Sequence, residues 1–378
     1  MRIGIDARFY GPLGKGLGRY TQKLIKNLEE IDDKNQYVVF LRKENWDEYV
    51  PENRNFQKVL ADYRWYTLKE QIYMPKLIKS RRIDVMHFPH FNIPILYRGS
   101  FVATIHDLIL IKYPTKKATT LDPIMYKFKY WGYKRVINSA VKRAKKIITV
   151  SNYTKNELID YFKIDKDKVS VTYEACNGVE SGQLELPDSS FLPRHNIEKP
   201  YILYVGNAYP HKNLEGLIST FKDFNADTDR KYQLVLVGKS DYFYERLKEY
   251  ADKKGLIENN DVVFFGYAAE KQLADLYRHA SLYIFPSLFE GFGLPPLEAM
   301  SYGLPVASSS ASCLPEILGD AAVYFNPKDK NNMMEVMKNV LGSRNLQEVL
   351  KEKGFNKIKQ YSWNKCARET LAIYNDIH

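Results

Sequence analysis

The stretch LYIFPSLFEGFGLPPLEAMSYGLPVA, residues 282–307, carries the pattern that decides the fold. It begins with an apolar run at residues 282–285, short enough for a buried strand, and ends with a second apolar run at residues 305–307. Between the two runs, Pro295 and Pro296 pre-set the start of a helix. Strand, helix and strand in this order predict a βαβ unit with parallel strands.

The same alternation of apolar runs and amphipathic segments extends over nearly the whole chain. It stops at residues 181–200, which are rich in Pro, Ser and Gly and are typical of a linker. The pattern predicts an α/β protein with two Rossmann-like, doubly wound domains facing a central cleft, because ligands of such sheets bind at the carboxyl ends of the strands. The predicted strands are residues 2–7, 37–41, 85–88, 101–105, 147–150 and 169–172 in the first series, and residues 201–205, 232–237, 262–265, 282–285, 305–307 and 321–325 in the second.

Length and composition narrow the class of protein further. The 378 residues, 45% hydrophobic and 27% charged, exclude a disordered or repetitive chain and suffice for two or three domains. Three cysteines, far apart, exclude a disulfide scaffold and favour a reducing compartment. Asp6 interrupts the first apolar run, which excludes a signal peptide, and no window approaches the ~20 apolar residues of a membrane span. We expect a cytoplasmic protein, in solution or peripheral on the inner face of the membrane.

Positive charge is concentrated in residues 112–146. This segment has eleven Lys or Arg and one acid, a net charge of +10 out of +11 for the chain, and aromatic residues are interleaved with the cations. A membrane surface, a solvated helix whose rings pack on its own domain, and a nucleic-acid site would each show this pattern. Because no nucleic-acid motif accompanies it, we favour an anionic membrane surface that also serves the acceptor. The residues expected there are Lys127, Lys129, Trp131, Lys134 and Arg135.

The sequence GPLGKGLG, residues 11–18, stands between a predicted strand and a predicted helix. Glycines allow backbone N–H groups to approach a ligand, and the helix start behind them favours an anion. The loop does not match the dinucleotide pattern GxGxxG, because Arg19 occupies the place of the third glycine, and it lacks the GK[ST] of a P-loop. A phosphate-binding loop and a plain glycine turn both remain open.

His106, in Ile105-His-Asp107, ends a predicted strand and could exchange a proton near neutral pH. A histidine that only caps or orients a loop would look the same in sequence. His87 and His90 have no third metal ligand near them, and we expect them to be packing and turn residues.

Lys212 lies in the sequence VGNAYPHKNL, residues 205–214, just before a predicted helix. A cation beside a helix start suits a diphosphate. The alternative is an exposed lysine with Asn213 as the helix N-cap.

Two glutamates bracket the helix start in the opening stretch. Glu290 precedes the Gly-rich turn, and Glu298 lies about one turn inside the helix. Carboxylates can bind sugar hydroxyls, and the amides of residues 292–294 can hold phosphate or sugar oxygens. A first-turn acid favoured by the helix dipole is the alternative for Glu298.

Asp227-Thr-Asp229 has the form of a metal-binding DxD motif. It falls in a polar turn between a predicted helix and a predicted strand, away from the strand carboxyl ends. We therefore expect a surface loop there.

Taken together, the motif with Glu290 and Glu298, the Pro-His-Lys-Asn segment, the glycine loop and Ile-His-Asp resemble the retaining GT-B glycosyltransferases of family 4, also called group 1 and including mannosyltransferases. The resemblance covers nearly the whole chain. It implies an acceptor-binding domain at residues 1–182, a linker at 183–200, a nucleotide-sugar-binding domain at 201–360 and a helix at 361–378 that crosses back to the first domain. It also implies that the leaving diphosphate is stabilised by protein groups, so that no metal or other cofactor is required.

The same resemblance implies roles for individual residues. Lys212 would neutralise the donor diphosphate, Glu290 would bind the transferred sugar, and His106 would lie beside the sugar and the acceptor hydroxyl; these three form the expected catalytic set. Many members have a basic residue near the position of Asn207, so a second cation would come from Arg19 or His211. The expected donor-binding residues are Gly14, Lys15, Gly16, Asn207, Lys212, Tyr267, Glu290, Gly291, Phe292, Gly293, Leu294 and Glu298.

The sequence thus predicts transfer of a sugar, with mannose from GDP-mannose favoured over a UDP-linked donor, to a glycan or lipid-linked acceptor. The expected partners are the donor, the acceptor and an anionic membrane surface, without nucleic acid. A sugar-nucleotide epimerase or hydrolase of the same fold, and a non-enzymatic nucleotide- or nucleic-acid-binding protein, are the alternatives.

Overall fold

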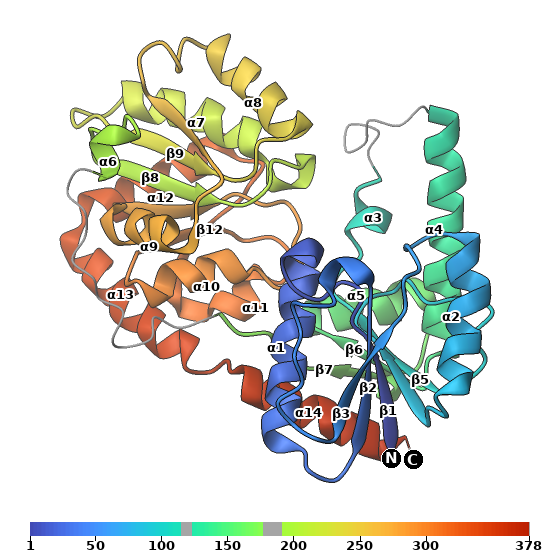
Figure 1. The fold of residues 1–378 in the computed structure, drawn as a ribbon. Helices are drawn as coiled ribbons and strands as arrows, with labels where there is room; N and C mark the ends of the chain where they lie inside the picture. Colours follow the sequence, from blue (N-terminus) through green and yellow to red (C-terminus); the bar gives the residue numbers. More distant parts are fainter. Residues whose placement is uncertain (115–122, 177–190, 378) are drawn as a thin grey trace. The chain divides into compact units, whose positions relative to one another are not determined.

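The computed structural model describes residues 1–114, 123–176 and 191–377. Contacts between residues divide the chain into two compact units (Figure 1). Unit 1 comprises Met1–Lys112, Thr119–Glu174 and Ser362–His378, and unit 2 comprises Tyr113–Ala118 and Ala175–Tyr361.

Unit 1 contains a seven-stranded, all-parallel sheet in the order β3-β2-β1-β4-β5-β6-β7. Helices cover both of its faces, as parallel sheets require. The strands are β1 (Arg2–Asp6), β2 (Gln36–Leu41), β3 (Phe56–Leu60), β4 (Val85–Phe88), β5 (Phe101–Ile105), β6 (Lys146–Thr149) and β7 (Val169–Val171). The helices are α1 (Lys15–Ile31), α2 (Leu68–Ser80), α3 (Ile109–Lys112), α4 (Pro123–Arg143), α5 (Asn152–Phe162) and α14 (Trp363–Asp376), with short 3-10 turns η1 (Pro12–Gly14), η2 (Lys43–Asn45) and η4 (Lys166–Lys168).

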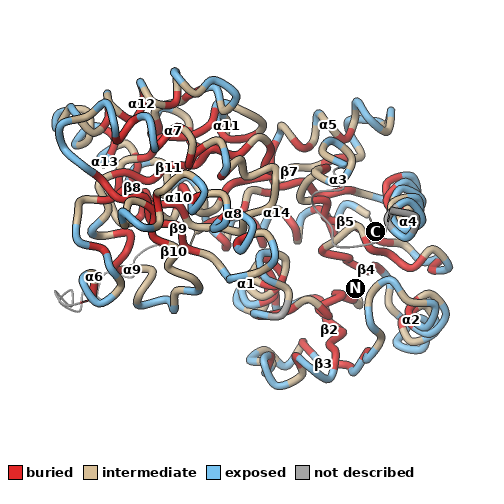
Figure 2. Tube along the Cα trace, turned by 90° about the horizontal axis from the view of Figure 1, so that it is seen from above, coloured by how far each residue is buried: buried red, intermediate tan, exposed pale blue. Residues whose placement is uncertain are grey.

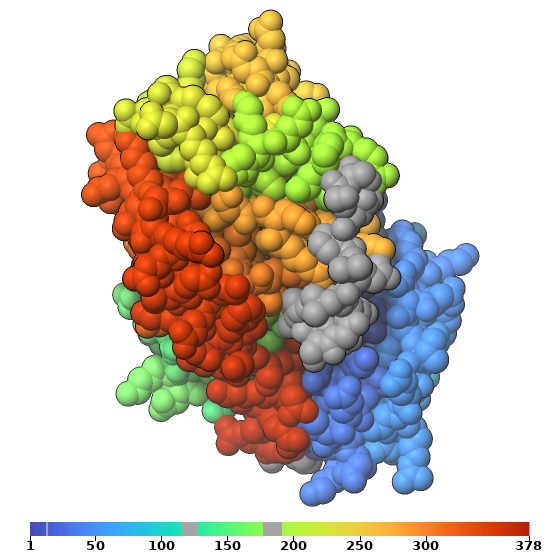
Figure 3. All heavy atoms as spheres, turned by 90° about the vertical axis from the view of Figure 1, so that its left-hand side faces the viewer, coloured from blue at the N-terminus to red at the C-terminus, as the bar shows by residue number. Residues whose placement is uncertain are grey.

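One hydrophobic core of unit 1 lies between the sheet and the helices α2, α4 and α5. Met74 of α2, Ile137 of α4 and Leu158 of α5 are buried in one hydrophobic cluster with side chains of six of the strands. Helices α1 and α14 pack against each other elsewhere on the unit, and Figure 3 shows the red C-terminal helix against the blue N-terminal segment. The prediction that the C-terminal helix returns to the first domain is therefore confirmed.

Unit 2 contains a six-stranded parallel sheet in the order β10-β9-β8-β11-β12-β13. Its inner strands are buried along most of their length (Figure 2). The strands are β8 (Tyr201–Val205), β9 (Gln233–Val237), β10 (Val262–Gly266), β11 (Leu282–Phe285), β12 (Val306–Ser309) and β13 (Ala322–Phe325). The helices are α6 (Phe191–Arg194), α7 (Leu214–Ala226), α8 (Tyr242–Asp252), α9 (Glu270–His279), α10 (Leu294–Ser301), α11 (Leu314–Leu318), α12 (Lys330–Gly342) and α13 (Arg344–Ile358), with 3-10 turns η5 (Pro210–Lys212) and η6 (Gly319–Ala321).

All twelve predicted strands are present within two residues of the predicted ends, but the sequence prediction missed one. Strand β3 (Phe56–Leu60) lies at the edge of the unit 1 sheet, where Phe56 and Val59 are buried. An edge strand can keep polar side chains, and Gln57 and Lys58 interrupt the apolar run that would have revealed it.

The cap of α5 is Ser151, whose side chain accepts a hydrogen bond from the backbone N–H of Thr154. Glu157 forms an ion pair with Lys112. Residues 183–190 of the predicted linker lie outside the described residues, and the rest of it includes the short helix α6.

The strand order fixes where the loops of each sheet meet. In unit 2 the chain moves outward from β8 to β10 and then returns to β11 on the other side of β8, so the order reverses between β8 and β11. In unit 1 the same reversal occurs between β1 and β4. Loops that follow two such strands diverge to opposite faces and leave a crevice between them, which is where ligands of doubly wound sheets bind.

Candidate active site

The loops after β8 and β11 carry an ion pair between two of the predicted residues. Lys212 Nζ lies 2.5 Å from Glu290 Oε1, although 78 residues separate them in sequence. Only 13% of the Lys212 side chain and 10% of the Glu290 side chain are exposed. The ammonium group also lies 5.5 Å from the centre of the Phe285 ring, at the end of β11. The structure thus brings Lys212 and Glu290 together at the reversal point of the unit 2 sheet.

Backbone contacts hold these two loops in register. The N–H of Leu288 donates to the carbonyl oxygen of His211 at 2.7 Å, which joins the loop after β11 directly to the one after β8. The N–H of Glu290 donates to Ser312 Oγ at 3.0 Å. The backbone at Glu290 is therefore held from the loop after β12, while its carboxylate is held by Lys212.

Cys313 has a structural part in the same loop. Its thiol donates to the carbonyl oxygens of Glu290 and Phe292, both at 3.3 Å. Burial raises the pKa of this thiol well above its ordinary value, so it stays protonated and able to donate. This role of Cys313 is not visible in the sequence, because nothing there places it beside the glutamate motif.

The turn before α10 requires glycine. Gly293 is the N-cap residue with φ of +95°, and a Cβ there would lie 2.8 Å from Leu314 Cδ2. Pro295 and Pro296 carry no N–H, so Gly293 and Leu294 are left to offer amide hydrogens at the helix start. These amides and the positive end of the helix dipole suit an anionic or hydroxyl oxygen.

Glu298 lies half-buried in α10, beside the hydroxyl of Tyr277. The Tyr277 hydroxyl donates to Glu298 Oε2 at 3.4 Å. Burial raises the pKa of Tyr277 well above its ordinary value, and the Glu298 charge raises it further, so the phenol remains a donor. One carboxylate oxygen of Glu298 is therefore held by Tyr277, while the residue as a whole stays partly exposed.

The remaining predicted residues of unit 2 differ in their surroundings. Asn207 accepts a hydrogen bond from the backbone N–H of Tyr209 at 3.3 Å, so its side chain shapes the loop. Tyr267 follows Gly266 at the end of β10 and is 78% exposed. Burial, with the neighbouring Lys212 charge, lowers the pKa of His211 to about 4, so His211 is neutral at pH 7 and does not supply the second cation in this structure.

The glycine loop of unit 1 contains glycines with two different reasons to be there. A Cβ at Gly14 would lie 1.9 Å from the carbonyl oxygen of Phe9, and a Cβ at Gly18 would lie 2.0 Å from that of Gly11. These glycines are required by the turn itself. Gly16 is exposed, and a Cβ there would contact no heavy atom within 4 Å.

Lys15, between these glycines, is exposed and has a positive φ of 51°. A plain turn therefore accounts for Gly14 and Gly18, but it gives no steric reason for glycine at position 16.

His106 is held by hydrogen-bond acceptors on both sides of its ring. Its Nδ1 lies 3.0 Å from Glu174 Oε1, and its Nε2 lies 3.0 Å from the carbonyl oxygen of Pro89. Burial alone would lower its pKa, but the Glu174 carboxylate and the other acceptors outweigh burial and raise the pKa above 6.5. In this geometry the imidazole donates through both nitrogens and orients the turn at Pro89.

His87 and His90 pack as predicted. His87 is fully buried, and His90 lies between the rings of Phe9 and Phe91, at centroid distances of 5.3 Å and 3.9 Å. Burial lowers the pKa of each to about 3, so both are neutral at pH 7.

A buried charge cluster at the end of β1 was not predicted. Arg8 is fully buried and binds Asp6 and Glu70, each at 2.7 Å. Burial alone would lower the pKa of Arg8, and the two carboxylates raise it above its ordinary value. The charged pair at positions 6 and 8, at the end of β1, was a visible signal, whereas Glu70, on α2, could only be found from the structure.

Several exposed cations and rings of the basic segment lie on α4. Phe128 is 72% exposed and Trp131 is 61% exposed, and Arg135 stacks over the Trp131 ring. Tyr133 packs against Phe91 of its own unit. The surface therefore combines exposed rings with one ring that belongs to the core. Lys127, Lys129, Lys134 and Arg135 are all exposed.

In the part of the chain that the structure describes, no helix combines the length and the apolar character needed to cross a bilayer. Asp227 follows α7 in an exposed turn and forms an ion pair with Lys338, so the DxD-like sequence lies in a surface loop as predicted.

Two family models match successive parts of the sequence. The model of glycosyltransferase family 4 matches residues 14–179, and the model of the glycosyl transferases group 1 matches residues 188–357. The chain belongs to these glycosyltransferases. The glycine loop and His106 fall within the first match, and Lys212, Glu290 and Glu298 fall within the second.

Curated relatives match this glycosyltransferase over most of its length. It is 28% identical to O-antigen chain mannosyltransferase B of Escherichia coli, over 95% of each chain. It is 27% identical to O-antigen chain mannosyltransferase RfbU of Salmonella typhimurium, over 87% of this chain and 88% of the relative.

Solved structures confirm the fold class. The glycosyltransferase WaaG, described as involved in lipopolysaccharide biosynthesis, superposes with a TM-score of 0.75 and 16% identity over 99% of each chain. The predicted GT-B class, with two Rossmann-like domains, is thus confirmed for this glycosyltransferase.

Proposed function

We propose that this glycosyltransferase transfers mannose from GDP-mannose to a glycan or lipid-linked acceptor, with retention of the anomeric configuration. The names of the two relatives above, both O-antigen chain mannosyltransferases, support mannose as the sugar. The observation that carries the proposal for the site is the ion pair of Lys212 and Glu290 at the reversal point of the unit 2 sheet.

Lys212 supplies the cation for the donor diphosphate. Without a ligand its charge is compensated by Glu290, whose Oε1 lies 2.5 Å away; both side chains are mostly shielded from water, so neither charge could remain there without a partner. A diphosphate entering the crevice offers the ammonium group a partner of higher charge. Lys212 then shifts toward the phosphate, and the Glu290 carboxylate becomes available to accept hydrogen bonds from hydroxyls of the transferred sugar.

The start of α10 supplies the neutral donors. The amides of Gly293 and Leu294 face the same turn as Glu290, and their hydrogens bind sugar or phosphate oxygens. Glu298, held by Tyr277, binds the ribose hydroxyls of the nucleotide. Gly291 and Phe292 belong to the backbone segment that Ser312 and Cys313 hold in place. The loops that contain Asn207 and Tyr267 contact the nucleotide.

In unit 1 the glycine loop provides contacts to the phosphate groups of the donor. Gly16 has no packing reason to be glycine, and its exposed amide at the start of α1 can approach an anion closely. Gly14 fixes the turn that presents Lys15 and Gly16. His106 keeps the turn at Pro89 in place beside the acceptor hydroxyl, as a positioning group for the reaction.

The bond between the anomeric carbon and the diphosphate breaks as negative charge develops on the leaving phosphate. Fixed positive groups aimed at that charge stabilise the transition state more than the ground state. Lys212 and the amides provide such groups, and the departing phosphate accepts the proton of the attacking acceptor hydroxyl on the same face of the sugar. We propose that no metal ion is required, because protein groups carry this stabilisation.

The variant Lys212→Met tests the assignment. We expect it to lower kcat by about 10³-fold, the scale of losing a group that stabilises transition-state charge. Lys199→Met is the matched control, because Lys199 also forms a partly buried ion pair in unit 2, 3.1 Å from Asp261. Unchanged turnover in folded Lys212→Met would refute the role of this lysine.

A donor panel with GDP- and UDP-linked sugars tests the substrate. GDP-mannose should be consumed only when an acceptor is present, and the product should keep the α configuration in its NMR spectrum. Donor conversion without an acceptor would indicate an epimerase or hydrolase instead. A preference for a UDP-sugar would overturn the donor but leave the role of Lys212 in place.

We further propose that α4 places the enzyme on an anionic membrane, where a lipid-linked acceptor would be found. Phe128 and Trp131 are exposed among lysines, an arrangement that suits the head-group region of a bilayer. Phe128→Ser with Trp131→Ser should abolish co-sedimentation with phosphatidylglycerol vesicles. The control Tyr242→Ser, which removes a half-exposed ring from unit 2, should not. Equal binding by all three proteins would refute the proposed surface.

A further inference from the structure

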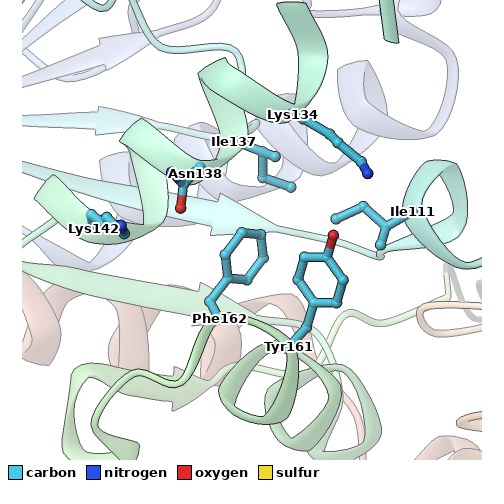
Figure 4. Close-up of a pocket in the computed structure, with 7 residues that line it drawn as sticks. All are labelled: Ile111, Lys134, Ile137, Asn138, Lys142, Tyr161 and Phe162. Atoms are coloured by element: carbon cyan, nitrogen blue, oxygen red, sulfur yellow. The ribbon is translucent and has the colours of Figure 1, made fainter. Parts of the chain in front are cut away.

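Unit 1 has a pocket of about 390 Å³ between α3, α4 and α5 (Figure 4). Ile111 of α3, Ile137 of α4 and Phe162 of α5 form its apolar part. Ile137 is buried, and the other two pack against the hydrophobic cluster of unit 1. The volume lies within the range of small-molecule sites, about 300–1,000 Å³. The pocket thus offers an apolar wall that is continuous with the core.

The polar part of the pocket has one sign of charge. Its side chains are those of Lys134, Asn138, Lys142 and Tyr161, and no carboxylate is among the described lining residues. Figure 4 shows the ammonium group of Lys134 and the hydroxyl of Tyr161 directed toward the end where Ile111 lies, with Lys142 at the opposite end. Two cations and two neutral hydrogen-bonding groups around an apolar wall favour an anion that carries an apolar part.

The sequence of α4 connects this pocket to the exposed part of the helix. Lys127, Trp131, Lys134, Asn138 and Lys142 are spaced by four, three, four and four residues, which places them on one face of the helix. The N-terminal part of this face therefore carries a cation and an exposed aromatic ring, and its C-terminal part lines the pocket. A ligand that arrives along this face would meet positive charge over its whole length.

We infer that the pocket binds a phosphate ester that carries an apolar chain. Lys134 neutralises the phosphate, the Tyr161 hydroxyl beside it donates a hydrogen bond to an oxygen of the phosphate, and the chain packs on Ile137 and Phe162. Lys142 and Asn138, at the opposite end of the pocket, add positive charge and a hydrogen-bond donor. Inorganic phosphate would leave the apolar wall in contact with water, so the chain adds hydrophobic affinity. Two sources share this chemistry, an isoprenoid phosphate and a glycerophospholipid.

This inference goes beyond the transfer reaction and depends neither on the sugar nor on Lys212. It also differs from general attraction of α4 to a membrane, because it requires the lysines that line the pocket rather than any two lysines of the helix. The two possibilities can be separated with soluble ligands, without a bilayer.

Binding to the full-length protein is measured by calorimetric titration with three probes: farnesyl phosphate, dihexanoylphosphatidylglycerol below its critical micelle concentration, and inorganic phosphate. We expect saturable binding of one or both chain-bearing probes and at least about tenfold weaker binding of inorganic phosphate. The stronger of the two chain-bearing probes identifies the source. The double variant Lys134→Gln/Lys142→Gln should raise the Kd of the bound probe by about tenfold or more, because the charge-assisted contact of Lys134 and the positive charge of Lys142 are both lost.

The matched control is Lys127→Gln/Lys129→Gln, which removes the same charge from the same helix outside the pocket. We expect it to change the Kd less than threefold, by the weaker effect of exposed charge. Tyr161→Phe, which removes only the hydroxyl, should weaken binding to an intermediate degree and serves where the double variant unfolds. Equal weakening by the control, equal binding of inorganic phosphate, or no binding of any probe would each overturn the inference.

Discussion

Acidification should destabilise unit 1 through His87. This side chain is fully buried, with Nε2 2.8 Å from Thr104 Oγ1 and Nδ1 2.6 Å from the Tyr374 hydroxyl. Hydroxyls can donate or accept, so they satisfy both nitrogens of a neutral imidazole, and no carboxylate is among these partners. Burial, with a smaller effect of His106, lowers the pKa of His87 from 6.5 to about 3.

The sign and size of the effect follow from proton linkage. The folded protein keeps His87 neutral while the unfolded chain binds a proton below pH 6.5, so this contribution to stability is fully present above 6.5 and is lost as pH falls toward the folded pKa of about 3. At pH 5, about 1.5 units below the unfolded pKa, protonation of His87 in the unfolded chain lowers the free energy of unfolding by ~2 kcal/mol, at ~1.4 kcal/mol per unit.

His106 acts in the opposite direction. Its pKa is raised above 6.5 because the Glu174 carboxylate and the other acceptors outweigh burial. Its contribution is therefore fully present below pH 6.5 and is lost as pH rises through the folded value. His90, whose pKa burial also lowers to about 3, acts in the same direction as His87. The wild-type profile contains all three effects, and a variant is needed to isolate the one from His87.

The assay is urea unfolding followed by tryptophan fluorescence at several pH values between 5 and 7. Trp46, Trp65, Trp131 and Trp363 are the four tryptophans of the chain, and all belong to unit 1, so the signal reports on that unit. The variant His87→Gln cannot titrate, and its loss of stability between pH 7 and pH 5 should be about 2 kcal/mol smaller than in the wild type.

The control for that experiment is His195→Gln, which makes the same substitution in unit 2 and should leave the profile of unit 1 unchanged. If the wild type and His87→Gln lose the same stability on acidification, His87 is not buried as a neutral group and the reasoning fails.

Further predictions concern the glycines and the metal. Gly18→Ala should lower the free energy of unfolding by about 3 kcal/mol, because its Cβ would overlap a carbonyl oxygen, and a stable Gly18→Ala would contradict the geometry of the loop. Gly16→Ala should leave the free energy of unfolding in urea unchanged or up to ~1 kcal/mol higher, while it raises the donor KM. Gly293→Ala should lower the melting temperature and raise the donor KM, because φ of +95° costs a non-glycine residue about 1–2 kcal/mol and Leu314 leaves no room, and wild-type values for both would show that the turn can relax. Turnover should persist in EDTA, and strict dependence on added Mn²⁺ would contradict the proposed stabilisation by protein groups.

The buried strands could be predicted from the sequence because a parallel sheet buries its strands on both faces. Strands such as β8 and β11 are continuous apolar runs, and their ends could be placed within a residue or two. Strand β3 was not visible, because an edge strand needs only two buried side chains, Phe56 and Val59, to hold its place. The information missing there was the pairing with β2, which only the folded sheet supplies.

The candidate site was predictable in location but not in its contacts. Loop motifs after strands indicated one edge of the sheet, yet nothing in the sequence pairs Lys212 with Glu290 rather than with Glu298. For His106 the missing information was Glu174, 68 residues away, because the imidazole that could exchange a proton is held by acceptors at both ring nitrogens and its pKa is raised. Such long-range partners determine what a titratable group can do, and composition and spacing do not reveal them.

The glycine loop shows how geometry separates the two interpretations that the sequence left open. Every glycine in GPLGKGLG looks alike in sequence, but Gly14 and Gly18 have no space for a side chain, while Gly16 has open space around its missing Cβ. A helical glycine that is not needed for packing costs ~1 kcal/mol relative to alanine. At Gly16 packing does not explain this loss of stability, but close approach of a ligand to the backbone would. Gly16 is therefore the glycine at which a role in binding can be measured separately from a role in folding.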